Sequence, residues 1–290
     1  MNALAQLPAI LGDIRLAHSV FALPFALLGL LLGTRGQVPD AWLLGKVVVA
    51  MVLARSAAMG WNRLVDARFD ASNPRTSGRA LPAGRVSSRG MAAFTLLCSA
   101  GFVAVAGSLN RACLLLAPVV LAVLLGYSLC KRFTNLSHLA LGLALALAPP
   151  AAYLAARGRI DADAPLVLLL GLAVLCWVSG FDVIYACQDV EHDRREGLHS
   201  LPARLGVARA LLFARVLHAG MVAALCALAA LAGLGTVSWG AIALVAALLV
   251  FEHRLVRGGD LSRVDAAFFT LNGVVSLLFA ALVGADLLWR

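Results

Sequence analysis

The chain has 290 residues, of which 62% are hydrophobic and 13% are charged, and its formal net charge is +9. A water-soluble protein of this composition has too few polar side chains to cover its surface, which excludes a soluble enzyme or binding domain. The positive charge alone would suit a nucleic-acid partner, so its distribution along the chain has to decide.

Long apolar runs separated by short charged stretches predict transmembrane helices of about 20 residues each. Helices are expected because backbone groups in lipid must be hydrogen-bonded within their own segment. The runs lack the alternation typical of membrane β-strands. The predicted fold class is an all-α integral membrane protein, a bundle of nine transmembrane helices in a single domain over 1–290. The predicted spans are 16–34, 41–60, 91–109, 112–130, 136–156, 165–187, 208–232, 237–252 and 266–288.

Lysine and arginine fall mainly in the loops on one side of this bundle. The loops on the other side carry Arg35, Arg111, Arg157 and Arg159. This bias follows the positive-inside rule and predicts a cytoplasmic N-terminus in a bacterial inner or plasma membrane. The first residues lack the features of a signal peptide, so we expect no removable signal. The charge is therefore mainly a topology signal, and we expect no nucleic-acid partner.

Two predicted cytoplasmic loops are rich in aspartate. In "NRLVDARFD" the side chains of Asn62, Asp66 and Asp70 recur at every fourth position, which places them on one face of a helix. In the second loop Asp189 and Asp193 have the same spacing. The two loops follow helices 41–60 and 165–187, on the same side of the membrane.

The two loops also resemble each other further along. Each passes from its aspartates through basic residues to the tripeptide "LPA", at 81–83 and at 201–203. This pattern predicts a degenerate internal repeat, with one Asp-rich half over 1–134 and the other over 135–290.

If the two helices that precede these loops face one another, four carboxylates converge on one cytoplasmic cavity. Like charges brought together in low dielectric repel strongly unless cations lie between them. Carboxylate and amide oxygens without histidine or cysteine favour a hard cation. The sequence therefore predicts Mg²⁺ held by Asn62, Asp66, Asp70, Asp189 and Asp193.

Basic residues follow the acidic ones and suit phosphate oxygens. Together with Mg²⁺ they predict a diphosphate-containing substrate. By contrast, Arg63, Arg68, Arg85 and Arg89 are explained by anchoring at the membrane surface. The predicted phosphate-binding residues are Arg75, Arg79, Lys131, Arg132, Arg194, Arg195 and His199.

Other polar and aromatic residues near the predicted spans are ambiguous. Asp182 lies inside span 165–187, where a carboxylate is costly and indicates function. Arg15 fits the membrane interface but is also within reach of the cavity as a substrate-binding residue. Phe21 and Phe25, one turn apart, fit either core packing or the wall of an apolar tunnel.

The segments "NRLVDARFD…NPRTSGRALPAG", "YSLCKR" and "DVIYACQDVEHDRREGLHSLPARLG" resemble the UbiA superfamily of intramembrane aromatic prenyltransferases. The resemblance covers essentially the whole chain. It implies Mg²⁺-dependent transfer of a polyprenyl group from polyprenyl diphosphate to an aromatic hydroxy acid during respiratory quinone biosynthesis. The cavity would open to the cytoplasm, with the prenyl tail in the lipid bilayer.

The resemblance also implies roles for individual residues. Asn62, Asp66, Asp70, Asp189 and Asp193 match the two metal-binding motifs. The residues that match diphosphate contacts are Arg75, Arg79, Tyr127 and Lys131. Asp182 and Tyr185 match positions near the reacting centre, where Asp182 orients the acceptor or stabilises the cation.

The acceptor and the class of protein each leave an alternative open. After the second motif the chain reads "GLHSLPARLG", with His199 where many members that act on 4-hydroxybenzoate have Lys-Ser-Thr. This variant is similar to a 4-hydroxybenzoate polyprenyltransferase-like branch, some members of which prenylate 1,4-dihydroxy-6-naphthoate. A secondary transporter with an acidic cytoplasmic cavity is the alternative from another class, because internal repeats and intramembrane aspartate are transporter features too.

Overall fold

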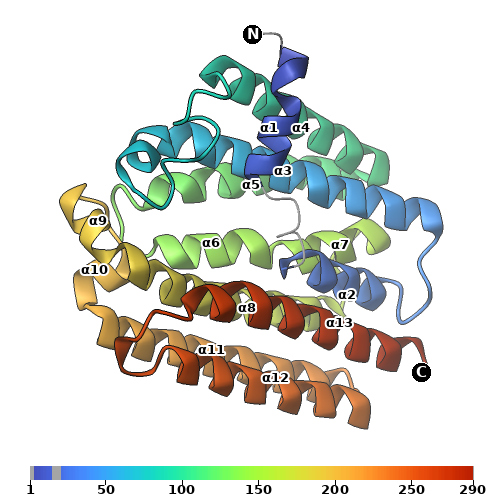
Figure 1. Cartoon of the computed structure of the whole chain (residues 1–290). Helices are drawn as coiled ribbons and strands as arrows, with labels where there is room; N and C mark the ends of the chain where they lie inside the picture. The colour runs from blue at the N-terminus through green and yellow to red at the C-terminus, as the bar shows by residue number, and fades with distance from the viewer. Residues whose placement is uncertain (1–2, 15–20, 290) are drawn as a thin grey trace.

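The computed structural model describes residues 3–14 and 21–289, with Arg15 and His18 outside the described ranges. These ranges are helical and connected by turns, as the sequence predicted (Figure 1). The helices are α1 Ala3–Ile14, α2 Leu23–Gly33, α3 Ala41–Ser72, α4 Ser88–Leu109, α5 Arg111–Cys130, α6 Ser137–Ala146, α7 Ala148–Arg157, α8 Ala164–Ala186, α9 Val190–Arg195, α10 Leu201–Leu205, α11 Val207–Leu231, α12 Thr236–Leu255 and α13 Asn272–Leu288, with short η2 Cys187–Asp189, η3 Arg257–Gly259 and η4 Ala266–Leu271.

The prediction of a helical membrane bundle is confirmed. Within the described ranges, 8 helices are long and apolar enough to cross a membrane. The first predicted span, 16–34, corresponds to the shorter apolar helix α2 of 11 residues. Span 136–156 is divided into α6 and α7, because Pro149 and Pro150 supply no backbone N–H and occupy the first turn of α7.

Helix α3 is longer than its apolar run. It begins where Asp40 caps it, with Oδ2 accepting hydrogen bonds from the N–H groups of Trp42 and Leu43 at 3.1 Å each. It continues to Ser72, 12 residues or about 18 Å beyond the predicted end at residue 60. This extension carries the first aspartates on a helix, as their spacing predicted.

The second Asp-rich segment is less regular than its spacing predicted. Helix α8 ends at Ala186, and the short turn η2 precedes α9, so Asp189 and Asp193 lie on different elements. The "LPA" tripeptides also differ, since 81–83 form turns whereas 201–203 begin α10. The internal repeat stays a prediction.

Aromatic side chains form the centre of the bundle. Trp177 on α8 is fully buried, and its ring centroid lies 5.1 Å from those of Phe25 and Phe181. Its Nε1 donates a hydrogen bond of 2.6 Å to Oδ1 of Asn272. Phe25 is therefore a core residue, which favours core packing over the wall of an apolar tunnel at that position.

Helices α2 and α7 approach each other closely in this core. A Cβ atom at Gly29 would lie 2.2 Å from the backbone oxygen of Pro149. Because real Cβ atoms never come so close to backbone, this contact requires glycine at position 29. The two short helices α2 and α7 are therefore in direct backbone contact at this point.

Helix α1 was not among the predicted elements. It lies across α3 and α4 at the edge of the bundle (Figure 1). Ile10 and Ile14 are buried against Val86 and Met91. This contact places the end of α1 next to the polar part of α3, where Asp13 takes part in the site.

Candidate active site

A cavity of about 1030 Å³ lies between the extended end of α3, the end of α5, helices α6 and α8, and the segment η2–α9. The elements that surround it include the turns after α3 and α9, which lie at the same end of the bundle (Figure 1). The predicted site residues that line it are Asn62, Asp66, Asp70, Arg75, Arg79, Tyr127, Lys131, Asp182, Tyr185, Asp189 and Asp193.

Two other predicted residues are not brought to this cavity by the described structure. Arg15 lies outside the described ranges. His199 is exposed, and its backbone N–H donates a hydrogen bond of 2.7 Å to the carbonyl oxygen of Lys131. The neighbouring Ser200 lines the cavity instead, where its hydroxyl donates to Oδ2 of Asp193 at 2.6 Å. The prediction of His199 as a cavity residue is wrong, because the extended backbone at Ser200 turns alternate side chains to opposite sides.

The predicted phosphate-binding pair Arg194 and Arg195 also lies elsewhere. Both side chains are exposed and neither lines the cavity. The Nε atom of Arg194 donates a hydrogen bond of 3.0 Å to the carbonyl oxygen of Ala203, which ties α9 to α10. Arg194 therefore has a structural contact in place of the predicted phosphate contact, and Arg195 lies outside the cavity.

Asp66 is at the centre of the first acidic group. Its side chain is 3% exposed, and Oδ2 accepts hydrogen bonds from Nδ2 of Asn62 at 2.9 Å and from Nζ of Lys131 at 2.7 Å. Its Oδ1 is buried and has no hydrogen-bond partner among the described residues, with Nη2 of Arg132 at 3.8 Å. A buried carboxylate oxygen without a hydrogen bond is costly and suits a cation ligand.

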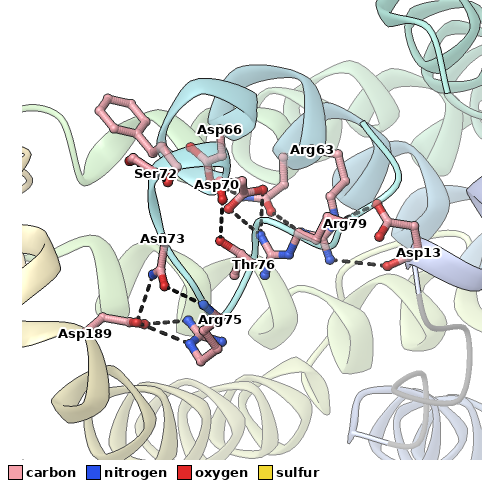
Figure 2. A network of polar contacts seen from close by, with 12 residues as sticks. Asp13, Arg63, Asp66, Asp70, Ser72, Asn73, Arg75, Thr76, Arg79 and Asp189 are labelled. Carbon is pink, nitrogen blue, oxygen red and sulfur yellow. Dashed lines mark hydrogen bonds and ion pairs between the residues drawn. The ribbon is translucent and has the colours of Figure 1, made fainter. Parts of the chain in front are cut away.

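Asp70, one turn further along α3, is paired with Arg79. The Nη1 atom of Arg79 lies 2.6 Å from Oδ1 and 2.7 Å from Oδ2 of Asp70 (Figure 2). The hydroxyl of Thr76 donates to the backbone oxygen of Asp70 at 3.1 Å, which fixes the turn that returns Arg79 to the helix. Local sequence alone thus supplies both partners of this ion pair.

Asp189 of the second acidic group contacts the turn after α3. Arg75 donates to it through Nε at 3.2 Å and Nη2 at 2.5 Å, and Nδ2 of Asn73 donates to Oδ1 at 3.1 Å (Figure 2). Nη1 of Arg75 also donates to the hydroxyl of Tyr185 at 3.1 Å. Burial lowers the pKa of Arg75, but the hydrogen bond and charge of Asp189 outweigh it, so the pKa is raised. Arg75 is therefore a permanent cation at this site.

The aspartates share one cavity, but they do not form a compact metal cluster. Within the part of the chain that the structure describes, no three Asp, Glu, His or Cys side chains converge as metal ligands. Lys131, Arg79 and Arg75 pair with Asp66, Asp70 and Asp189, which relieves much of the repulsion that the sequence predicted, and Asp193 accepts a hydrogen bond from Ser200. The predicted convergence of the four aspartates is therefore limited to their lining the same cavity.

Arg63 is a further residue of this network. It was predicted to be a surface anchor, but it is 6% exposed, lines the cavity and forms an ion pair of 3.2 Å with Asp13 of α1. That prediction is wrong because α1, absent from the expected elements, covers this face of α3. No signal in the charge pattern alone distinguishes Arg63 from the other arginines of the loop.

Deeper in the cavity, Asp182 is paired with a histidine that the sequence analysis missed. Nδ1 of His138 on α6 lies 2.7 Å from Oδ2 of Asp182 on α8, and both residues line the cavity. An ionised carboxylate can only accept a hydrogen bond, so in this contact Nδ1 of His138 is the donor. An ionisable side chain within a predicted span was the signal for His138, as it was for Asp182.

Aromatic side chains complete the inner wall. The ring of Phe268 lies 4.1 Å from that of Tyr185, 5.2 Å from that of Phe181 and 5.7 Å from that of Phe21, measured between centroids. All of these side chains line the cavity. The cavity therefore has a charged mouth and an aromatic interior, which suits a ligand with an anionic head and an apolar tail.

The comparisons with known proteins agree with this architecture. Residues 22–274 match the model of the UbiA prenyltransferase family. A 4-hydroxybenzoate octaprenyltransferase from Aeromonas salmonicida is 34% identical over 257 residues, which cover 86% of this chain and 84% of that protein.

Solved structures with the same fold include two archaeal proteins. The apo structure of a UbiA homologue from Aeropyrum pernix K1 is similar with a TM-score of 0.86 at 35% identity, over 94% of this chain and 98% of that one. A UbiA homologue from Archaeoglobus fulgidus, bound to DMAPP and Mg²⁺, has a TM-score of 0.76 at 21% identity and covers 97% of this chain and 99% of that one. The family match, the identity and the fold together identify the chain as a member of the UbiA prenyltransferase family.

Proposed function

We propose that this membrane protein transfers a polyprenyl group from polyprenyl diphosphate to an aromatic hydroxy acid, with Mg²⁺ as cofactor, in respiratory quinone biosynthesis. The observation that carries the proposal is the division of one cavity into a charged mouth and an aromatic interior. A relative at 34% identity is named 4-hydroxybenzoate octaprenyltransferase, which supports this reaction. The family membership argues against the transporter alternative.

The charged mouth is proposed to bind Mg²⁺ and the diphosphate. Oδ1 of Asp66 is buried without a hydrogen bond, and the other donors are carboxylate and amide oxygens, which fit a hard cation. When bound, Mg²⁺ neutralises the negative charge that develops on the leaving diphosphate. The residues proposed to hold the metal are Asn62, Asp66, Asp70, Asp189 and Asp193.

The cations of the mouth are proposed to bind the phosphate oxygens. Arg75, Arg79 and Lys131 each lie within 2.7 Å of a carboxylate oxygen. A diphosphate gives these side chains a second set of oxygens, so they stabilise the leaving group as the allylic C–O bond breaks. Tyr127 lines the same part of the cavity and is proposed to contact the diphosphate with them.

The aromatic interior is proposed to hold the reacting carbon and the acceptor. The faces of Phe181, Phe268 and Tyr185 stabilise a nearby allylic cation and exclude water that would hydrolyse it. Asp182, held by His138 through Oδ2, presents Oδ1 without a hydrogen bond to another described residue. This oxygen is proposed to accept a hydrogen bond from the hydroxyl group of the acceptor and so to orient the ring.

Two acceptors suit this site, 4-hydroxybenzoate and 1,4-dihydroxy-6-naphthoate. The names of the curated relatives support the first. The segment 197–206, "GLHSLPARLG", supports the second through the resemblance of its branch. Arg15, outside the described ranges, stays a candidate substrate-binding residue.

The orientation in the membrane is proposed from charge. The mouth of the cavity lies at the end of the bundle that carries the turns rich in Arg, whereas Arg35 and Arg157 lie at the opposite end. The positive-inside rule then places the N-terminus and the mouth in the cytoplasm. Reporter fusions after residue 85 and after residue 158 test this, and a cytoplasmic signal from the second fusion would overturn it.

The reaction is tested with purified protein, labelled prenyl diphosphate and the two acceptors in competition. We expect Mg²⁺-dependent transfer to one acceptor, abolished in Asp66→Ala and retained in Asp260→Asn, whose carboxylate lies outside the cavity. Absence of transfer from folded protein to either acceptor contradicts the proposal. Counterflow of a solute by the same preparation would then favour the transporter.

A further inference from the structure

A second cavity lies on the other side of the bundle, between α11 and α12. Its volume is about 550 Å³, and it shares no lining residue with the first cavity. Its walls combine apolar side chains such as Val222 and Leu249 with three arginines. Helices α11 and α12 lie at the edge of the bundle farthest from α3 and α4 (Figure 1).

One of these arginines lies well inside its helix. Arg215 is exposed and comes eight residues after Val207, the first residue of α11, which is about 12 Å along the helix axis. Arg254 and Arg257 stand at the end of α12 and just beyond it. A charged side chain so far along a spanning helix is costly unless an opposite charge reaches it.

The acidic side chain next to this cavity is the buried Glu252, whose Oε2 lies 3.7 Å from Nδ1 of His218 and not beside an arginine. None of Arg215, Arg254 and Arg257 forms an ion pair with a carboxylate from residues 3–14 or 21–289. In the first cavity, by contrast, Arg79 and Lys131 each have a carboxylate within 2.7 Å. Among the described residues, the three arginines of the second cavity therefore have no carboxylate partner.

Two histidines form the inner wall of this cavity. His218 is 3% exposed, and its Nδ1 lies 3.0 Å from Nε2 of His253. A Cβ at Gly180 would lie 2.3 Å from the His218 ring, so the imidazole is seated directly on α8. Nδ1 of His253 is buried without a hydrogen-bond partner in the part of the chain that the structure describes. The cavity is thus a built site with a polar group still to be satisfied.

We propose that this second cavity, a groove between α11 and α12, binds an anionic phospholipid. The arginines match the phosphate of a lipid headgroup, and the apolar wall beside them accommodates the first part of an acyl chain. The volume lies within the range of sites for small molecules. A lipid is the occupant that the position favours, because the lining residues belong to two helices long and apolar enough to span a membrane and to the turn that follows them.

The groove is separate from the prenyl-transfer site, so the proposal does not rest on the proposed function. His218 is the link between them, since its Nε2 lies 3.3 Å from the carbonyl oxygen of Trp177, whose ring belongs to the central aromatic core. A lipid bound against α11 and α12 is accordingly expected to stabilise the bundle as a whole.

The test titrates dioleoylphosphatidylglycerol or dioleoylphosphatidylcholine into delipidated protein in detergent, followed by native mass spectrometry and thermal unfolding. We expect the anionic lipid to bind more tightly and to raise the unfolding temperature more than the zwitterionic one. In the double variant R215Q/R254Q, binding of the anionic lipid should weaken about thirtyfold, or about fivefold per arginine. The single variant Arg257→Gln, outside the helix, should weaken it about fivefold.

The matched control is R209Q/R263Q, which removes two exposed arginines of the same region that do not line the groove. It should keep the binding and the thermal shift of the wild-type chain. Equal losses in both double variants, or equal binding of the two lipids, would overturn the proposal. A similar thermal shift with inorganic phosphate alone would replace the lipid with a free anion.

Discussion

Nδ1 of His138 lies 2.7 Å from Oδ2 of Asp182, across the contact between α6 and α8. The histidine side chain is 6% exposed and the aspartate 23%, so the histidine is buried in the cavity wall and the aspartate is partly open to the cavity. This arrangement fixes one oxygen of Asp182 and leaves the other for a ligand.

His138→Leu should therefore reduce kcat by about tenfold to a hundredfold, because it removes a hydrogen bond to a charged group. KM for prenyl diphosphate should change little, since the charged mouth is untouched. His138→Gln, which retains a donor, should recover most of the activity. Steady-state kinetics with each substrate varied in turn measure this, and an equal loss in the Leu and Gln variants would falsify the positioning role.

Asp66 combines a hydrogen bond to Lys131 with an unsatisfied buried oxygen. Asp66→Asn keeps the size of the side chain but removes its charge, so it should lower kcat/KM by about a hundredfold or more. It should also raise the Mg²⁺ concentration needed for half-maximal activity. A metal titration checks both, with Asp260→Asn as the control, and an unchanged metal requirement would exclude Asp66 as a metal ligand.

Arg75 makes two contacts with Asp189 and one with Tyr185. A lysine cannot reproduce this fork. Arg75→Lys should raise KM for prenyl diphosphate by about tenfold or more, because a charge-assisted contact is lost. The control is Arg195→Lys, an exposed residue outside the cavity. The phosphate-binding role fails if the two variants have the same KM.

Gly29 and Gly45 provide a matched test of packing within the membrane. Gly29→Ala places a Cβ 2.2 Å from the Pro149 backbone oxygen, whereas nothing lies within 4 Å of a Cβ at Gly45. Gly29→Ala should lower the unfolding temperature, since α2 and α7 must separate. Gly45→Ala should leave it unchanged or raise it, because alanine favours a helix by up to about 1 kcal/mol. Thermal unfolding in detergent measures both, and equal shifts would contradict the close contact.

Much of the fold and part of the site were predictable from local patterns. Apolar runs of sufficient length identify spanning helices without reference to their neighbours, because the lipid is the same for all of them. The spacing of Asn62, Asp66 and Asp70 places them on one helical face wherever that helix lies. The ion pair between Asp70 and Arg79 is also a local feature, because the two residues are only nine positions apart.

Other features depended on residues that are distant in the sequence. His138 and Asp182 are 44 positions apart in the sequence and lie on two different helices, and Arg75 and Asp189 are 114 positions apart. Arg63 is buried because α1 covers it, and His199 is exposed because the turn before α10 directs Ser200 inward.

The sequence by itself determined that this chain is a helical membrane protein with two groups of aspartates at one end of its helices. The tertiary structure alone decided which cations pair with Asp66 and Asp189, which histidine holds Asp182 and where α11 and α12 leave arginines without a carboxylate partner among the described residues. The reason is physical. Hydrophobicity and helical spacing act within one segment, whereas a charge pair depends on how separate segments pack, and no single segment contains that information.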